Sequence, residues 1–371
     1  MALTLSNFRA VGFEDPVETI HVDDDGYVAP QAIAGARTVD CNGGYLSPGW
    51  CDLHVHVWHG GTDISVRPGE AGRPTGVTAM ADAGSAGEGN FHGLREYVID
   101  QQSETIRAFL NIGSIGLVCC NRVPELIDMR SIDVDRTLET IEAHRDVICG
   151  IKVRASGVIV GSWGITPAKI AKRVAEISGL PLMVHVGEPP PLIDEVFDIL
   201  GEGDIVTHCF NGKKAGSIND TQALWDQAKR LADSGVRMDV GHGQASFDFD
   251  VARRAIADGL RPFSISTDLH LRNIAGPVHD MATTLSKLLA VGLPFENCLE
   301  AVTAAPRSVV GLGAKAGLTP GEIADFTVFD LAPGALDVVD SQGNHMTLDQ
   351  LFEPRMTVLG NDVQEANRRS A

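Results

Sequence analysis

Short apolar runs alternate with longer amphipathic stretches through the middle of this chain. Between the runs lie stretches with helical periodicity, among them 134–145, 166–178, 220–235 and 250–259. Continuous apolar runs are typical of parallel strands that are buried on both faces. Eight β/α units in about 250 residues favour a closed barrel over an open, doubly wound sheet. The apolar runs cover residues 51–57, 77–84, 108–113, 148–156, 181–188, 204–211, 236–243 and 263–270.

The two ends of the chain have a different texture. Residues 1–50 combine short strand-like runs with an Asp-Gly turn signal and a Gly- and Pro-rich stretch, and the pattern after residue 314 becomes strand-like again. We expect 1–50 and 315–371 to form one small β-sandwich domain, and 51–314 to form the barrel. The predicted fold class is therefore α/β, a (β/α)8 TIM barrel with a small β domain built from both chain ends.

Charge and composition narrow the choice of partners and compartment. The 371 residues carry a formal net charge of −19, and the sequence pI is about 4.9. Such a surface repels nucleic acid and anionic membranes, so we expect neither as a partner. The chain has no apolar run of the roughly 20 residues that a membrane span needs, and its start does not resemble a signal peptide. The seven scattered cysteines lack a C-x-x-C pair, which indicates reduced thiols and a cytoplasmic protein.

Residues of metal-binding and acid–base type stand in or just after six of the predicted strands. Active sites of (β/α)8 barrels lie at the C-terminal ends of the strands. Taken singly, each residue could be a hydrogen-bonded core histidine, a snorkelling lysine or a helix cap. Their convergence at one end of one sheet is better explained by a metal site. The residues are His54 and His56 on the first strand, Lys152 on the fourth, and His185, His208, His242 and Asp268 on the fifth to eighth.

These residues give the chain a family resemblance. The stretch PGWCDLHVH, the fourth-strand lysine, the single histidines of strands five and six and the final aspartate resemble the amidohydrolase superfamily, and so does GEIADFTVFD near the end. The resemblance implies two divalent metal ions, usually zinc. It implies six ligands: His54, His56 and Asp268 for one ion, His185 and His208 for the other, and Lys152 as a bridge. The amine of Lys152 would be carboxylated by CO2, because a carbamate offers anionic oxygens where an ammonium would repel both cations.

The same resemblance implies a hydrolase. Two ions can hold a hydroxide that attacks a polarised carbonyl, and Asp268 would act as general acid and base. The chain resembles the dihydroorotase-like branch, yet Trp58 stands where dihydroorotases have an arginine. The stretches DAGSAG, HVGEPPP and THCFNGK look like a deacetylase-type group that is often labelled dihydroorotase. We therefore expect removal of an acyl group, with acetyl the first candidate, from a small carboxylate-bearing ester or amide.

Three features could bind the anionic end of this small-molecule substrate. Arg154 follows Lys152 by two residues and could grip a carboxylate in bidentate fashion or pair with an acidic neighbour. His242 could contact the substrate or lie behind it, and the loop after the sixth strand carries two lysines. A cyclic amide hydrolase of the dihydroorotase or hydantoinase type remains the alternative. A non-enzymatic relative is disfavoured because all six ligand positions are filled. Similar barrels often self-associate, so a homo-oligomer stays open by analogy, and the sequence does not decide the oligomeric state.

Overall fold

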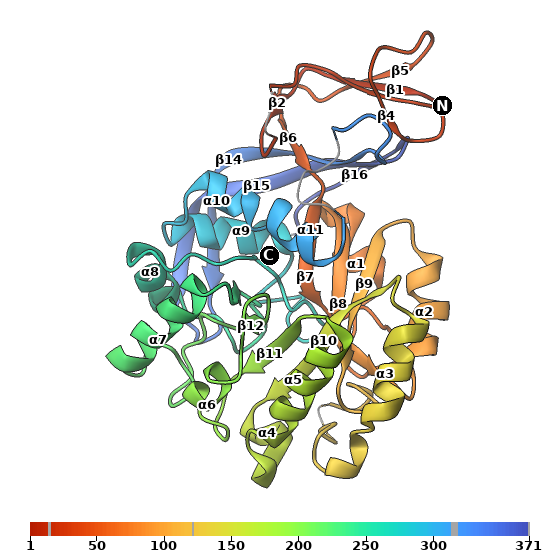
Figure 1. Cartoon of the computed structure of the whole chain (residues 1–371). Coiled ribbons are helices and arrows are strands. Elements are labelled where there is room, and N and C mark those ends of the chain that lie inside the picture. Colours follow the sequence, from red (N-terminus) through yellow and green to blue (C-terminus); the bar gives the residue numbers. More distant parts are fainter. Residues whose placement is uncertain (14–15, 121, 313–317, 370–371) are drawn as a thin grey trace.

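Seven parallel strands form the central sheet of the computed structural model, which describes residues 1–13, 16–120, 122–312 and 318–369 (Figure 1). The predicted boundary between residues 314 and 315 lies outside the described residues. Neighbouring strands follow the order β13-β12-β11-β10-β9-β8-β7. Their bounds are β7 (Trp50–Val55), β8 (Val77–Gly87), β9 (Thr105–Asn111), β10 (Ile148–Ala155), β11 (Leu182–Val186), β12 (Ile205–Thr207) and β13 (Arg237–Asp239).

The segment 263–270 closes the barrel between β13 and β7. It forms isolated parallel bridges, Asp239 with Ser264 and Val55 with Leu269, rather than a regular strand. The amide of Val240 donates to the carbonyl of Ser264 at 3.0 Å, and the amide of His56 donates to Leu269 at 3.1 Å. The eighth predicted strand therefore takes its expected place, and the predicted (β/α)8 barrel is confirmed.

Helices cover the outer face of the sheet and side chains of the barrel interior bury its inner face, so the strands are buried on both faces. All eleven residues of β8 and all six of β7 are buried. The predicted helices at 134–145, 166–178, 220–235 and 250–259 are present, and three of them begin at a side-chain cap. For example, Asp248 accepts hydrogen bonds from the first-turn amides of its helix. The outer helices are α2 (Phe91–Tyr97), α3 (Val134–Ala143), α5 (Thr166–Ser178), α6 (Ile193–Phe197), α7 (Gln222–Asp233), α8 (Phe249–Ala257), α9 (Met281–Ala290), α10 (Phe295–Glu300) and α11 (Ala304–Val309).

Two further sheets combine both ends of the chain beside the barrel (Figure 1). Their strand orders are β4-β3-β1-β5 and β16-β15-β14-β6-β2. An apolar core that includes Leu5, Val22, Phe326 and Val358 joins the two sheets. The strands are β1 (Leu3–Ser6), β2 (Arg9–Ala10), β3 (Ile20–Val22), β4 (Val28–Ala29), β5 (Arg37–Asp40), β6 (Tyr45–Pro48), β14 (Asp325–Val339), β15 (His345–Leu359) and β16 (Asp362–Glu365).

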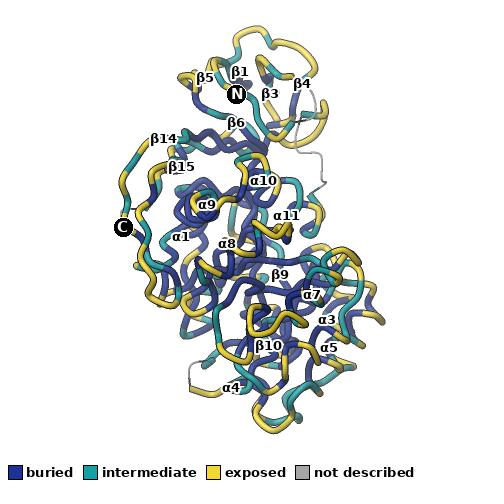
Figure 2. The backbone as a smooth tube through the Cα atoms, turned by 90° about the vertical axis from the view of Figure 1, so that its left-hand side faces the viewer, coloured by how far each residue is buried: buried dark blue, intermediate teal, exposed yellow. Residues whose placement is uncertain are grey.

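The long hairpin of β14 and β15 links this small β domain to the barrel. Its outer part runs beside α9, where the amide of Phe352 donates to Ser286 Oγ at 2.9 Å. Figure 2 shows buried backbone in the interior and exposed backbone mainly in outer loops. Within the described part of the chain, no helix is both long and apolar enough to cross a bilayer. Cys41, Cys51, Cys119, Cys149, Cys209 and Cys298 form no disulfide bond within the described part of the chain.

Candidate metal centre and substrate pocket

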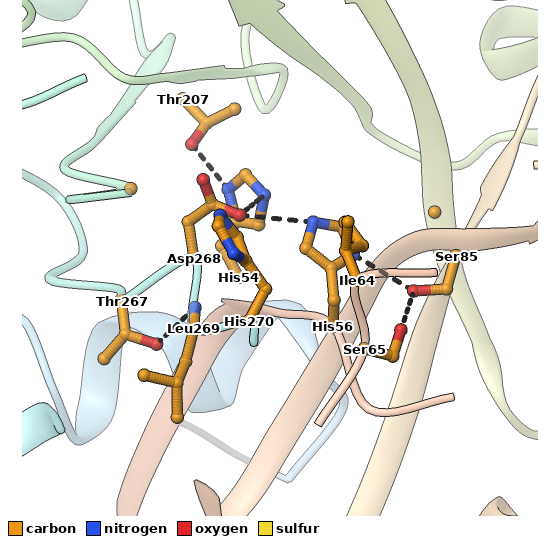
Figure 3. A network of polar contacts seen from close by, with 12 residues as sticks. His54, His56, Ile64, Ser65, Ser85, Thr207, Thr267, Asp268, Leu269 and His270 are labelled. Atoms are coloured by element: carbon orange, nitrogen blue, oxygen red, sulfur yellow. Dashed lines mark hydrogen bonds and ion pairs between the residues drawn. The ribbon is translucent and has the colours of Figure 1, made fainter. Parts of the chain in front are cut away.

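Four of the six predicted ligands meet where β7, β10 and the closing segment end. Figure 3 shows three of them, His54, His56 and Asp268. Asp268 Oδ1 lies 3.2 Å from His56 Nε2 and 3.4 Å from His54 Nε2. The amine of Lys152 lies 3.2 Å from the same His54 Nε2. Because residues i and i+2 of an extended chain share a face, His54 in β7 and His56 directly after it point to the same side. We call these four residues, together with His185 and His208, the ligand cluster.

The two remaining predicted ligands lie against this group. Single ligand atoms of His54, His208 and Asp268 all lie within 4.8 Å of one another, which is close enough to share one ion. The His185 and His208 rings are 4.4 Å apart between centroids, in an edge-to-face arrangement. The structure therefore brings together all six residues that the sequence singled out from five different segments.

Two members of the ligand cluster have a left-handed backbone, which non-glycine residues rarely adopt. His208 has a φ of 70° and Asp268 a φ of 49°. Such a conformation costs about 1–3 kcal/mol and persists only where the surroundings hold it. The amide of Asp268 donates to the carbonyl of His54 at 2.6 Å, and Asn273 Nδ2 donates to the carbonyl of Asp268 at 2.7 Å. The strain turns both side chains toward the cluster, as is common at functional sites.

A buried hydrogen-bond chain fixes the His54 ring. Thr207 Oγ1 donates its single proton to Asp239 Oδ2 at 2.7 Å, so it accepts from His54 Nδ1 at 2.8 Å (Figure 3). Asp239 also accepts from Ser264 Oγ at 2.5 Å and Ser266 Oγ at 2.8 Å. The proton of His54 is therefore held on Nδ1. Its Nε2 lone pair faces the cluster, which is the arrangement that a metal-binding imidazole needs.

The rings of His208 and His56 are oriented in a similar way. His208 Nδ1 donates to the carbonyl of Gly241 at 2.6 Å, and His56 Nδ1 contacts Ser85 Oγ at 3.0 Å. The Nε2 atom of His208 is buried and has no hydrogen-bond partner among the described residues. A buried nitrogen without a partner is costly, and a divalent cation would satisfy it. The donor set of the ligand cluster therefore fits a metal site.

Burial keeps these groups in their metal-binding protonation states. It lowers the pKa of His208 to about 4 and lowers that of His54 well below the usual value. It also lowers the pKa of Lys152 to about 7. Among the described residues, Lys152 forms no ion pair, and its amine contacts only His54 Nε2 and Met183 Sδ, the latter at 3.4 Å. A neutral amine is the form that reacts with CO2, so this environment suits a carboxylated lysine.

A cavity of about 170 Å³ opens onto the ligand cluster. This volume is below the roughly 300 Å³ at which typical ligand pockets begin, which indicates a small substrate. The cavity reaches three cationic side chains, those of Arg154, Lys213 and Arg272. Its other lining residues outside the cluster are Ile64, Leu117, Cys120, Gln244, Ala245, Ser246 and His270.

Arg154 lines the pocket as expected but is engaged by an acidic neighbour. Its Nε donates to Glu125 Oε1 at 2.8 Å, and its Nη2 donates to Glu125 Oε2 at 2.5 Å. The side chain of Glu125 is fully buried, so this ion pair is part of the pocket structure. Two of the three guanidinium nitrogens therefore already donate to Glu125. Arg154 cannot bind a substrate carboxylate through that same pair of nitrogens.

His242 does not line the pocket. It lies in the loop after β13 and is fully buried. Its Nδ1 lies 2.9 Å from the carbonyl of Gly243, and its Nε2 lies 3.0 Å from the amine of Lys287. Both ring nitrogens are therefore engaged within the protein. This geometry puts His242 behind the pocket, which is the second of the two roles that the sequence left open.

Several functional positions escaped the sequence analysis. Thr207 and Asp239 orient a ligand ring, and Arg272 provides a cation at the mouth. A signal for Asp239 was available, since a carboxylate inside the apolar run 236–243 requires buried partners. Thr207 and Arg272 gave no comparable signal, because their roles depend on contacts with distant segments.

Comparisons with known proteins agree with this geometry. The sequence model of the amidohydrolase family matches residues 45–363. A deacetylase of Agrobacterium fabrum is 54% identical over 375 residues, which cover 99% of this chain and 92% of the relative. A crystal structure described as a dihydroorotase shares 52% identity with a TM-score of 0.96, covering 100% of this chain and 99% of its own. One described as an adenine deaminase shares 32% with a TM-score of 0.89, covering 98% and 99%. The chain is therefore a hydrolase that belongs to the amidohydrolase family.

Proposed function

We propose that this chain is a deacetylase that uses two divalent metal ions, with zinc as the first candidate. Its substrate would be a small ester or amide that carries an acetyl group at one end and a carboxylate at the other. The observation that carries the proposal is a cavity of about 170 Å³ with the ligand cluster on one side and cationic side chains near its mouth. The deacetylase name of the 54% identical relative supports the acyl group chosen.

The ligand cluster would hold both ions. In the division that the family resemblance implies, His54, His56 and Asp268 would bind one ion, His185 and His208 the other, and carboxylated Lys152 would join them. The short distances among His54, His208 and Asp268 would then reflect two neighbouring ions rather than a shared one. Bound ions of this kind polarise an acyl carbonyl and lower the pKa of water toward 7. Without the carbamate, Asp268 is the only carboxylate among these six residues, so Lys152 would supply the second anionic ligand.

Asp268 would move the proton. Its Oδ1 faces His54 and His56, and its Oδ2 lies beside the backbone of Gly243, where an added β-carbon would come within 2.6 Å of it. Hydrogen bonds of its own amide and carbonyl hold its backbone. A carboxylate held in this way can accept a proton at Oδ2 and return it to the leaving oxygen or nitrogen. The glycine leaves room for that exchange.

The three cationic side chains near the cavity mouth differ in whether a carboxylate of the protein already pairs with them. Arg154 is paired with Glu125, and the amine of Lys213 lies 2.9 Å from Glu188 Oε1. Arg272 is exposed and forms no ion pair within the described part of the chain. We therefore assign the substrate carboxylate first to Arg272, with Arg154 shaping the pocket behind it.

A cyclic amide hydrolase is the second candidate, and the structure described as a dihydroorotase at 52% identity favours it. Position 58 argues against it. Trp58 is not among the residues that line the cavity, and its ring packs so closely on Gly61 that a β-carbon there would lie 2.2 Å from it. A tryptophan has no charge, so position 58 cannot supply the cation that the carboxylate of dihydroorotate would require. Hydantoins carry no ring carboxylate, and the turnover assay below separates them.

Turnover by the purified enzyme tests the proposal. We would supply zinc and bicarbonate, then compare N-acetyl amino acids and acetylated 2-hydroxy acids with dihydroorotate and hydantoins. We expect acetate release from at least one acetylated acid, loss of the activity with a chelator and its return with zinc. Turnover of dihydroorotate without acetate release from any acetylated acid would overturn the proposal in favour of the second candidate.

A further inference from the structure

The loop between β13 and α8 forms one wall of the pocket, although it has no regular secondary structure. Gln244, Ala245 and Ser246 of this loop line the cavity. The loop also touches the ligand cluster, since Gly241 accepts the hydrogen bond of His208 Nδ1 at 2.6 Å. Its position therefore affects both the substrate space and the cluster. We call residues 241–246 the wall loop.

A fully buried lysine on α9 holds this loop from behind. The amine of Lys287 lies 3.0 Å from His242 Nε2, 2.6 Å from the carbonyl of Pro277 and 2.8 Å from that of Val339. Burial lowers the pKa of Lys287 to about 7, yet its amine faces two carbonyls and an imidazole nitrogen, which can all accept. An ammonium, with three protons and no lone pair, can donate to all three, whereas the neutral amine of Lys152 has no carbonyl partner among the described residues. The proton of His242 is then held on Nδ1, which donates to Gly243.

The turn of the β14–β15 hairpin completes the support. The amide of Ser341 donates to the carbonyl of Phe247 at 2.9 Å, and its hydroxyl donates to that of Gly243 at 3.1 Å. The amide of Phe249 donates to Asp340 Oδ2 at 3.0 Å. Residues 340 and 341 thus reach the loop from the C-terminal hairpin, far away in the sequence.

Packing adds to these hydrogen bonds. The ring of His242 stacks on Phe247 with 4.6 Å between centroids. A β-carbon at Gly243 would lie 2.6 Å from Asp268 Oδ2, so the loop backbone and the carboxylate are in close contact. A small displacement of the loop would therefore reach Asp268 directly, because close-packed groups transmit shifts.

We infer that Lys287, acting through His242 and together with the turn at Ser341, is a positioning residue that sets the wall loop against the substrate and Asp268. None of these three side chains lines the cavity. The C-terminal hairpin is therefore part of the catalytic apparatus of the barrel, and substrate affinity depends on it. The inference rests on the proposed function only for its kinetic consequence.

The first test compares Lys287→Met with Lys172→Met. Lys172 lies on α5 and pairs with Asp204 at 2.5 Å, so its loss controls for removal of a partly buried lysine. In Lys287→Met we expect amide hydrogen exchange across 241–246 to speed up at least tenfold, with zinc content unchanged. For the acetylated acid that the wild type hydrolyses, KM should rise about tenfold while kcat changes less, because loosened positioning weakens binding first. Lys172→Met should show neither effect.

A second, milder variant keeps the inference testable if Lys287→Met does not fold. Ser341→Ala removes one hydrogen bond to Gly243 and should raise exchange and KM by about twofold to threefold in the same direction. Equal exchange at 241–246 in Lys287→Met, Ser341→Ala and wild type would overturn the inference. If the wild type hydrolyses no acetylated acid, the proposed function fails, while the exchange measurement still decides the role of Lys287.

Discussion

The ligand cluster and the wall loop face the same cavity but are held in different ways. Cluster residues stand in strands or directly after them, and nearby hydroxyl and carbonyl groups fix their rings. The wall loop is held by α9 and the hairpin turn, across separations of 45 to 99 residues in the sequence. The comparison indicates that the barrel supplies the chemistry, whereas distant segments adjust the space in which the substrate lies.

The largest effect should follow from loss of the proposed bridging ligand. In Lys152→Ala we expect the zinc content to fall below two ions per chain and kcat/KM to fall by more than about 100-fold, beyond the range for residues that only orient a ligand. Elemental analysis and acetate release measure both. Lys229→Ala, at a surface lysine paired with Asp258, is the control. Full activity with two bound zinc ions would contradict the bridging role.

Crowding the same lysine should have the next largest effect. Gly84 has a φ of 90°, and a β-carbon there would lie 2.7 Å from Lys152 Cγ. Gly84→Ala should therefore displace Lys152, lower zinc content and lower stability by about 2–4 kcal/mol, from backbone strain plus overpacking. Gly203→Ala is a matched control, since its φ is 87° and nothing lies within 4 Å. Equal zinc content and equal melting temperatures in the two variants would contradict the crowding argument.

The orienting chain behind His54 should matter less. Thr207→Val removes the hydroxyl between His54 Nδ1 and Asp239 but keeps the shape of the side chain. We expect zinc affinity to fall about 10-fold to 100-fold, measured by competition with a chelator. Thr78→Val is the control, because the buried hydroxyl of Thr78 has no hydrogen-bond partner among the described residues. An unchanged affinity in Thr207→Val would mean that Asp239 does not act through this hydroxyl.

The smallest effect should follow from substitution of Arg272 at the cavity mouth. Arg272→Gln should raise KM for an anionic acetylated acid by up to about fivefold, since an exposed charge pair contributes at most about 1 kcal/mol. Added salt should reduce the difference, and a neutral acetyl amide should show none. Arg173→Gln, at an exposed arginine on α5, is the control. The same KM change for anionic and neutral substrates would remove Arg272 from carboxylate binding.

The sequence was most informative where backbone geometry is regular. The C-terminal ends of parallel strands meet at one end of the barrel, so a metal site could be predicted there from residues in separate runs. The choice of six ligands among those residues came from the family resemblance. The sequence was less informative for Arg154 and His242, because their partners Glu125 and Lys287 lie 29 and 45 residues away in the sequence. Such polar pairs depend on how distant segments pack together, which the periodicity of apolar residues does not predict.

The closing segment of the barrel indicates a second role for the proposed metal ions, in the assembly of the fold. Residues 263–270 join β7 and β13 through isolated bridges, so this seam has fewer regular backbone bonds than the rest of the sheet. The proposed ligands His54, His56 and Asp268 come from the two sides of this seam. Ions bound there would tie the first strand of the barrel to the last segment, so that loading the metals would finish the assembly of the fold.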